Sequence, residues 1–577
     1  MDKILKKSNF IIFFIFALTF IFAFGFSLFQ LNPSIDTGRE FYLSYRVLSG
    51  DVLYKDIFNI YGPLAYQINA FAYKLLGADI NALRIFGSLN SSLIMLAVYF
   101  TLKEFLIEKS KETSALTFLL WLCPLITGVF YIGTFNYTVP YAFAMTYGLC
   151  FFLFSLLFFV KFEKTKNFNF LFLSTFLCGG AVTCKYEFVA YLLFLFIYSA
   201  FAQKNNRKIF LISILTTSVI PLISFGTLFL QGMTFGDLAN TFHIQKVMSK
   251  TDAIKYLYTN YAGTYFSLKV FGYCLLKTAL FGILTVLLYF ANKFYPDDKI
   301  LFPTTLLFVI LGTAYIGFGS FSLFGILHLI LFLCFIKKIY QNKPLFIIMF
   351  SVILLSLKTF FGINYDVYGT YILPFIIISL GIFVYTFDFS ANENKKQLIK
   401  AVFTEGILLS LLCMTSYKAI IGVYLKTSGK IFVETVQNQH NYFEKIQKIV
   451  FLKPAISKTT KETIDFINKN TNPDDTIVIL PETQFLNFVT KRPADNLYDS
   501  LTPLYFETFG EENIISHFKE TRPKYFILNN RDTSDYGKKY ICENYGQNLC
   551  KFIKKDYEKI QEIGENKYKL QIYRRID

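Results

Sequence analysis

Histidine is scarce in this sequence, and its scarcity bears on metal chemistry. The chain has 577 residues and only four histidines. They are scattered and do not have the spacing of a metal-ligand set; they are His243, His328, His440 and His517. We expect no metal site: a divalent metal is compatible with the sequence, but no residue pattern indicates one. Internal repeats and low-complexity tracts are also absent.

Charged residues are nearly absent from a series of long apolar runs. Hydrophobic residues make up 54% of the chain, and the mean hydropathy is +0.44. Each run is roughly 18 to 23 residues long, enough to cross ~30 Å of hydrocarbon. This composition excludes an ordinary soluble protein and predicts a polytopic α-helical membrane protein with about 13 transmembrane helices. The predicted spans are 8–30, 82–103, 115–132, 137–160, 168–184, 186–203, 208–230, 270–292, 300–317, 319–336, 344–361, 370–388 and 401–422.

Lysine and arginine are nearly absent from alternate connectors, near Gly133, Gly317 and Gly362, whereas the other connectors carry two or three each. This alternation follows the positive-inside rule and predicts a cytoplasmic N-terminus. With an odd number of spans, the C-terminus then lies outside the cell membrane. The formal net charge of +17 needs no nucleic-acid partner to explain it.

The predicted topology divides the chain into two domains. Residues 1–422 form the membrane domain, with extracytoplasmic segments at 31–81 and 231–268. Residues 423–577 form an extracytoplasmic domain in which helical and β-branched segments alternate, which is typical of a small α/β domain with a partly parallel sheet. We predict helices in 461–470 and 512–523 and strands in 474–482, 524–530, 550–564 and 567–575.

Cysteine is also infrequent, with nine residues in the chain. Seven lie in or beside apolar spans, where a thiol is usually a small packing residue. Cys542 and Cys550 lie in the extracytoplasmic domain. Both a disulfide between them and two free thiols fit the sequence.

A charged cluster follows the first apolar run, in the stretch NPSIDTGRE. Asp36 and Glu40 are four residues apart, so on a helix they share a face. One interpretation is local: Thr37 and Glu40 form a capping box, and Asp36 favours a helix N-terminus. The other is functional, because charged groups at a bilayer edge are costly unless they are solvated, paired or used. A carboxylate there can serve as a general base.

The segment around this cluster resembles the first extracytoplasmic loop of GT-C glycosyltransferases. These include the protein O-mannosyltransferases, the lipid A aminoarabinose transferases and their bacterial relatives. The matching features are Asp36 after the first span, the run from Gly50 to Asp56, the motif Gly62-Pro63-Leu64 with Tyr66, and Arg84 at the second span. Three later segments also resemble the family: CKYEF (184–188), LKTFFGINYDVYGTYILP (357–374) and PETQFLNFVTKR (481–492).

The resemblance implies a membrane enzyme that transfers a sugar from a polyprenyl-phosphate donor, at the outer face of the membrane, to a lipid, glycan or protein of the cell envelope. By this resemblance Asp36 is the catalytic base, Glu40 is a second candidate, and the anomeric configuration is inverted. Membrane lipids and the lipid-linked sugar are the expected partners, and no cofactor is implied.

A leaving phosphate requires cations near it. The resemblance and the predicted topology suggest that the donor is held by Arg39, Arg84, Lys185 and Lys358, with Tyr368 as a hydrogen-bond donor. Tyr61 occupies the position where the aminoarabinose transferases carry a lysine near the leaving phosphate. Lys185 and Lys358 have an alternative interpretation as lysines that extend to the membrane interface.

Three other function classes compete with this hypothesis. A non-catalytic scaffold with a binding tail does not explain the acidic residues of the first loop. A transporter or flippase for lipid-linked sugars typically has inverted repeats and ionisable residues at mid-membrane, which are nearly absent here. A polymerase or ligase of surface glycans usually has one large late extracytoplasmic loop, whereas this chain concentrates its polar residues after the first span.

Overall fold

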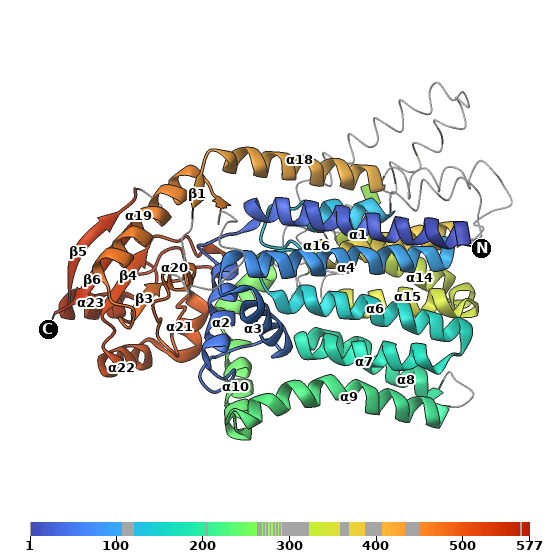
Figure 1. Ribbon diagram of the computed structural model, residues 1–577, viewed down its shortest axis with the longest axis horizontal. Helices are drawn as coiled ribbons and strands as arrows, with labels where there is room; N and C mark the ends of the chain where they lie inside the picture. Colours follow the sequence, from blue (N-terminus) through green and yellow to red (C-terminus); the bar gives the residue numbers. More distant parts are fainter. Residues whose placement is uncertain are drawn as a thin grey trace.

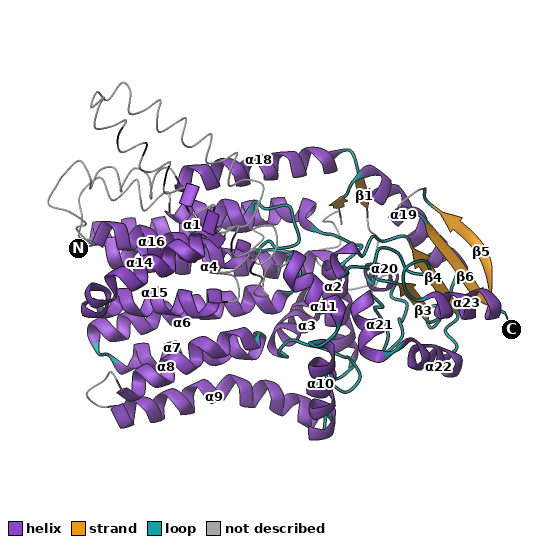
Figure 2. Cartoon of the chain, turned by 180° about the vertical axis from the view of Figure 1, so that it is seen from behind, coloured by secondary structure: helices purple, strands orange, loops and turns teal. Residues whose placement is uncertain are grey.

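Long helices run side by side through most of the molecule, and a small α/β domain lies beyond one end of them (Figures 1 and 2). The structure is a computed structural model that describes residues 2–106, 120–201, 206–261, 322–357, 369–386, 407–432, 449–565 and 568–576, with isolated residues between 268 and 290. The N-terminus lies at the end of the bundle opposite this domain. Both segments predicted to be extracytoplasmic, 31–81 and the described part of 231–268, lie at the same end as the α/β domain.

The bundle consists of helices that match most of the predicted apolar spans. They are α1 (Asp2–Gln30), α4 (Ile80–Leu106), α6 (Phe143–Thr165), α7 (Phe168–Cys184), α8 (Val189–Phe201), α9 (Asn206–Leu230), α14 (Ser322–Gln341), α15 (Lys343–Ser356), α16 (Thr370–Thr386) and α18 (Ile407–Thr427). By length and composition, four described helices can cross a membrane: those of spans one, two, four and seven. Shorter apolar helices account for other spans. The predicted spans 270–292 and 300–317 lie largely or wholly outside the described residues, so the total of 13 stays a prediction.

The predicted start of the fourth span at residue 137 is wrong, because α6 begins only at Phe143. The Asn136 carboxamide oxygen accepts the backbone N–H groups of Thr138 (2.8 Å) and Val139 (2.6 Å), and its nitrogen donates to the Val139 carbonyl (2.8 Å). Such local side-chain bonds offer the backbone an alternative to helix. The apolar residues from 137 to 142 therefore form a buried irregular segment that follows a π-helical turn (Leu125–Val129).

Short helices fill the space between the bundle and the α/β domain. The first connecting segment forms α2 (Asp36–Ser49) and α3 (Leu64–Leu76). The second forms α10 (Phe235–Met248) and α11 (Asp252–Tyr256), followed by a π-helical turn (Leu257–Tyr261). On α10 and just after it, His243, Lys246 and Lys250 are exposed, so they form a solvated face rather than a buried site.

The C-terminal domain contains a four-stranded sheet in the order β3-β4-β6-β5. Strands β3 (Ile477–Leu480) and β4 (Tyr525–Asn529) pair in parallel, whereas β6 (Leu570–Arg575) is antiparallel to β4 and to β5 (Tyr557–Ile563). The predicted, partly parallel sheet is therefore present. Its helices are α19 (Pro454–Asn470), α20 (Phe485–Thr490), α21 (Pro503–Phe509), α22 (Glu511–Thr521) and α23 (Gln547–Asp556), and β1 (Lys430–Phe432) and β2 (Ile449–Phe451) form a separate pair.

The two faces of the sheet bury alternate residues, as strand geometry requires. Ile477 and Ile479 pack in the core that includes α2, α3 and α20, whereas Val478 and Leu480 pack with α22 and α23. The predicted strand 550–564 is wrong in its first half, which lies in α23. There Leu549, Cys550 and Ile553 are buried at helical spacing, a periodicity that favours a helix over a strand.

A close backbone approach fixes the C-terminal domain on α2. A Cβ atom at Gly38 would lie 2.7 Å from the Phe485 Cβ atom and 2.9 Å from the Phe485 nitrogen, so only glycine lets α20 approach this closely. The Tyr42 hydroxyl accepts the Ala494 N–H (2.7 Å), and Arg46 donates to the Asn496 side chain (3.1 Å). These contacts hold the domain against the first connecting segment.

Cys542 and Cys550 are joined by a disulfide. Its two half-cystines lie eight residues apart and link the start of α23 to the turn before it.

Candidate active site

Asp36 is the first residue of α2, at the junction of the bundle and the C-terminal domain. Its side chain is exposed to solvent, and within the described chain it makes no hydrogen bond or ion pair. Many protein atoms nevertheless lie around the exposed carboxylate. The desolvation that they cause raises the pKa of Asp36, while the guanidinium groups of Arg531 and Arg39 oppose the rise. The combination places an accessible carboxylate of increased basicity at the site that the sequence predicted.

Glu40 is buried, with 2% of its surface exposed. One carboxylate oxygen accepts the Tyr66 hydroxyl (2.7 Å), and the other accepts the Phe143 N–H at the start of α6 (2.9 Å). Burial raises the pKa of Glu40 to about 7, and these two hydrogen bonds oppose the rise. Glu40 thus joins α2, α3 and α6, and a direct catalytic role for it stays a prediction that its geometry does not favour.

The predicted capping box is wrong. The helix starts at Asp36, two residues earlier than the motif requires, so Ile35 is the N-cap and no side chain caps the helix. The Thr37 hydroxyl is buried without a hydrogen-bond partner, and Glu40 uses both oxygens elsewhere. A capping box needs both side chains to bond the first-turn backbone, and neither does.

Arg39 lies one turn after Asp36 and donates one hydrogen bond, from Nη2 to the Phe58 carbonyl (3.3 Å). Its Nε atom is buried without a partner in the described chain. Among its electrostatic neighbours are Tyr505 and Asp499 of the C-terminal domain. Arg39 is therefore only partly used by the protein and remains the cation nearest in sequence to Asp36.

The C-terminal domain adds a second charged group that the sequence analysis did not single out. The Arg531 guanidinium pairs with Glu482 (2.5 Å) and with Asp535 (3.4 Å). Burial raises the pKa of Glu482 to about 8, and Arg531 opposes the rise. The charges of Asp36 and Arg39 also act on Glu482, so the two groups of residues face each other.

A signal for these residues is present in the sequence. Glu482 follows β3 by two residues and Arg531 follows β4 by two residues. Carboxyl ends of neighbouring parallel strands meet at one sheet edge, which is where ligands bind in open α/β sheets. Glu482 also lies in the segment PETQFLNFVTKR, which resembles the family, but the resemblance assigns no role to this acid.

The motif Gly62-Pro63-Leu64 packs against the end of α7. A Cβ atom at Gly62 would lie 1.9 Å from the Thr183 carbonyl oxygen, and the Gly62 N–H donates to the Cys184 carbonyl (3.0 Å). Pro63 is the N-cap residue of α3, and Asp56 accepts the Val52 N–H (2.9 Å). The contacts of Gly62 hold the loop against the end of α7.

Lys185 follows α7 and lies beside this loop. It is buried, with 5% of its surface exposed, and contacts the Tyr141 hydroxyl (2.6 Å) and the Glu187 carboxylate (3.2 Å). Its ammonium also lies 5.4 Å from the centre of the Tyr61 ring. The structure therefore brings two of the predicted donor-binding residues, Lys185 and Tyr61, into contact.

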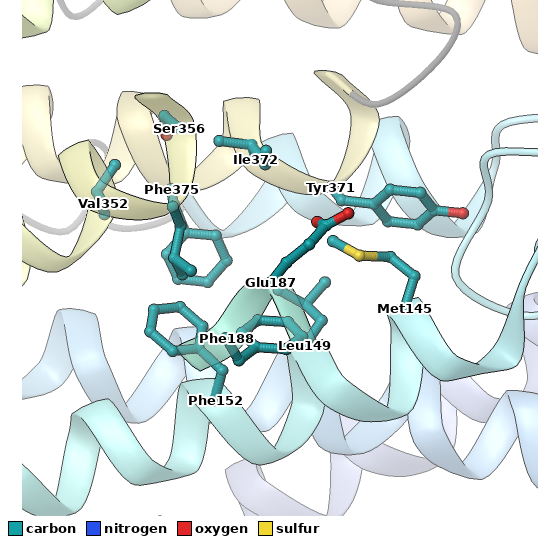
Figure 3. A pocket seen from close by; sticks show the side chains of 11 residues that line it. Met145, Leu149, Phe152, Glu187, Phe188, Val352, Ser356, Tyr371, Ile372 and Phe375 are labelled. Atoms are coloured by element: carbon teal, nitrogen blue, oxygen red, sulfur yellow. The ribbon is translucent and has the colours of Figure 1, made fainter. Parts of the chain in front are cut away.

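A small, partly open cavity lies beside Glu187. Its other lining residues are mostly apolar and come from α6, α15 and α16 and from the turn after α7; they include Met145, Phe152, Val352 and Phe375. Figure 3 shows the Glu187 carboxylate pointing toward Tyr371 and Met145, above the apolar wall. The cavity thus has a charged end near Lys185 and an apolar interior between bundle helices.

Among the other predicted residues, Arg84 does not join this arrangement. Arg84 is fully buried and bonds only Asn81 (3.3 Å), while its Nε and Nη2 atoms have no partner in the described chain. Lys358 and Tyr368 lie outside the described residues. Within the described ranges, no group of three or more His, Cys, Asp or Glu side chains could hold a metal ion.

The architecture matches solved structures through almost its whole length. The crystal structure of ArnT from Cupriavidus metallidurans bound to undecaprenyl phosphate aligns with a TM-score of 0.50 at 11% sequence identity, covering 98% of this chain and 98% of that chain. The chain has the fold of ArnT, a GT-C fold. The same ArnT in the apo state aligns with a TM-score of 0.46 at the same identity and coverage.

The ArnT fold confirms the predicted class, a multi-pass helical membrane protein with a small C-terminal α/β domain. No protein-family model matches the sequence, and no curated protein matches it. At 11% identity the likeness establishes the fold, whereas the roles of individual residues depend on the geometry described above.

Proposed function

We propose that the protein is a membrane glycosyltransferase that moves a sugar from a polyprenyl-phosphate donor to a lipid, glycan or protein acceptor. The observation that carries this proposal is the ArnT fold, which extends over 98% of both chains and belongs to a protein crystallised with undecaprenyl phosphate. The accessible Asp36 carboxylate, placed where the membrane helices meet the α/β domain, supports the same assignment.

Asp36 acts as the general base in this proposal. It takes the proton from the acceptor as the acceptor oxygen attacks the anomeric carbon, so a new C–O bond forms while the bond to the phosphate oxygen breaks. The configuration inverts, and polyprenyl phosphate leaves. A raised pKa makes Asp36 a stronger base than an ordinary carboxylate.

Lys185 and Arg39 receive the donor phosphate. Lys185 stands at the charged end of the apolar cavity, so the polyprenyl carbons next to a phosphate bound beside it would face apolar side chains. Tyr61 lies against the Lys185 ammonium and limits how far the phosphate can move. For Arg84, Lys358 and Tyr368, a donor contact remains a prediction from the family resemblance.

Mass spectrometry of a deletion strain tests the function. Loss of the protein should cause one polyprenyl-phosphate sugar to accumulate and one envelope glycoconjugate to lose that sugar, because the transfer step is blocked. Restoring the gene should reverse both changes. If neither the lipid-linked sugars nor the envelope glycans change, the proposed function is wrong.

A reporter fusion tests the proposed orientation. A phosphatase that is active only outside the cytoplasm, fused after Asp577, should be active, because the predicted odd number of spans implies an extracytoplasmic C-terminal domain. The same reporter fused within the connector at 204–208 should be inactive. Reversed results would put the site on the cytoplasmic face and contradict the use of an outward-facing lipid-linked donor.

A further inference from the structure

The ion-pair network of Glu482, Arg531 and Asp535 in the C-terminal domain faces Asp36. An ion-pair network at a domain boundary often serves only to hold the domains together. The contacts here differ from that pattern. Arg531 pairs with Glu482 and with Asp535, and its backbone N–H donates to the Asn529 side-chain oxygen, so all of these partners lie inside the C-terminal domain.

Docking of the domain on α2 relies on other residues. The contact of Gly38 with Phe485 and the hydrogen bond from Ala494 to Tyr42 hold α2 against the domain. Arg46 adds a hydrogen bond to Asn496. None of these docking contacts involves Glu482, Arg531 or Asp535.

The charge balance around Asp36 indicates what this side of the site can bind. Charged groups from three segments interact electrostatically with Asp36 or with Glu482. Arg39 and Glu40 lie on α2, Glu482 follows β3, and Arg531 and Asp535 follow β4. Two guanidinium groups thus face two to four negative charges, counting Asp36 and depending on whether Glu40 and Glu482 are protonated. Arg39 also binds the donor phosphate in the proposed function, so no excess positive charge remains for a phosphorylated or carboxylated acceptor.

Tyrosine rings and polar atoms without a hydrogen-bond partner in the described chain also lie around Asp36 and Glu482. Tyr505 on α21 and Tyr536 after β4 both interact with Asp36 and Glu482. Arg39 Nε and Asp535 Oδ1 have no hydrogen-bond partner within the described chain. Carboxylates, a guanidinium and tyrosines around a solvent-accessible carboxylate provide the polar groups and ring faces that a molecule with several hydroxyl groups can use.

We infer that the edge of the C-terminal sheet formed by Glu482 and Arg531 is the acceptor-binding half of the site, and that the acceptor is an uncharged carbohydrate bound between this edge and Asp36. This inference rests on the proposed function, and it narrows the acceptor from lipid, glycan or protein to a glycan hydroxyl. Glu482 and Arg531 orient the acceptor hydroxyl, and Asp36 takes its proton.

The first test uses the full-length protein in cells. The deletion strain is complemented with wild type, Glu482→Gln, Arg531→Met or a control pair, and its envelope glycans are analysed by mass spectrometry. The control pair is Glu558→Gln and Arg574→Met, which changes a comparable ion pair of the same sheet that is solvent-exposed. We expect the sugar to be missing from a neutral glycan in the first two variants and present in the controls.

The second test uses the purified full-length protein, the lipid-linked sugar that accumulates in the deletion strain and the glycan that lacks the sugar. In Glu482→Gln the KM for the glycan should rise at least about tenfold, because an orienting charged hydrogen bond is lost. The KM for the lipid-linked sugar should stay unchanged, which a general loss of structure would not produce. Arg531→Lys should restore part of the glycan affinity that Arg531→Met loses.

The outcomes separate the inference from the proposed function. If the missing sugar is normally attached to a phosphate, a lipid amine or a protein side chain, the function holds and the inference is wrong. If Glu482→Gln and Arg531→Met both restore the glycan fully with an unchanged KM, the inference is also wrong. If deletion changes no lipid-linked sugar and no glycan, the proposed function fails and the inference fails with it.

Discussion

Replacing Asp36 by Asn should abolish sugar transfer while the protein still folds. Removal of a general base typically lowers the rate by about 100- to 10,000-fold. Asn has nearly the same size, and the Asp36 side chain makes no hydrogen bond or ion pair in the described chain. Its favourable charge at the start of α2 contributes only about 0.3–1 kcal/mol to stability. Transfer from the accumulated lipid-linked sugar, measured in membranes containing equal amounts of protein, is the readout.

Asp252→Asn is the matched control, because Asp252 is also the first residue of a helix and is 91% exposed. It should transfer sugar at the wild-type rate. A pH series adds a second readout. The base must be deprotonated, so activity should fall as the pH drops through the raised pKa of Asp36, at a higher pH than an ordinary aspartate would give. Wild-type activity in Asp36→Asn would remove Asp36 from the mechanism.

Replacing Gly62 by Ala should damage the junction between the first connecting segment and α7. The added Cβ atom would lie 1.9 Å from the Thr183 carbonyl oxygen, 2.6 Å from the Thr183 carbonyl carbon and 3.1 Å from the Cys184 carbonyl oxygen. All three are backbone atoms, so the clash is relieved only by moving the loop or the end of α7. Overpacking of this kind costs about 1–3 kcal/mol or more, and here it also displaces Tyr61 from Lys185.

The measurement is the thermal unfolding midpoint of the purified protein in detergent, together with sugar transfer. We expect a lower midpoint and reduced transfer. Gly226→Ala is the control, since no atom lies within 4 Å of the added Cβ on α9, and alanine favours a helix over glycine. An unchanged midpoint and unchanged transfer in Gly62→Ala would show that the loop packs less tightly against α7 than its contacts indicate.

Local patterns in the sequence predicted most secondary structure. Apolar runs fixed most of the bundle helices because membrane spanning imposes length and composition directly. Errors arose where a side chain competed with the backbone, as Asn136 does before α6, and where helical and strand periodicities overlap, as in α23. The capping box failed for a similar reason: Glu40 found long-range partners on α3 and α6 that no local pattern shows.

The candidate site was only half visible in the sequence. Asp36, Arg39, Tyr61 and Lys185 could be found because they belong to short segments that resemble a known family. Glu482 and Arg531 lie more than 440 residues from Asp36 along the chain, and nothing local relates them to it. Their meeting depends on the parallel pairing of β3 and β4 and on the approach of α20 to Gly38.

By itself, the sequence determined that this chain is a multi-pass helical membrane protein with a C-terminal α/β domain and a charged cluster after its first span. Those properties follow from composition and from periodicities within about 20 residues, so they depend only on the local sequence. The tertiary structure alone decided that Glu40 is buried and hydrogen-bonded, that Asp36 is accessible, and that the C-terminal sheet faces Asp36. Burial and electrostatic neighbourhood are properties of the packed molecule, because they depend on residues brought together by chain folding and not on their order.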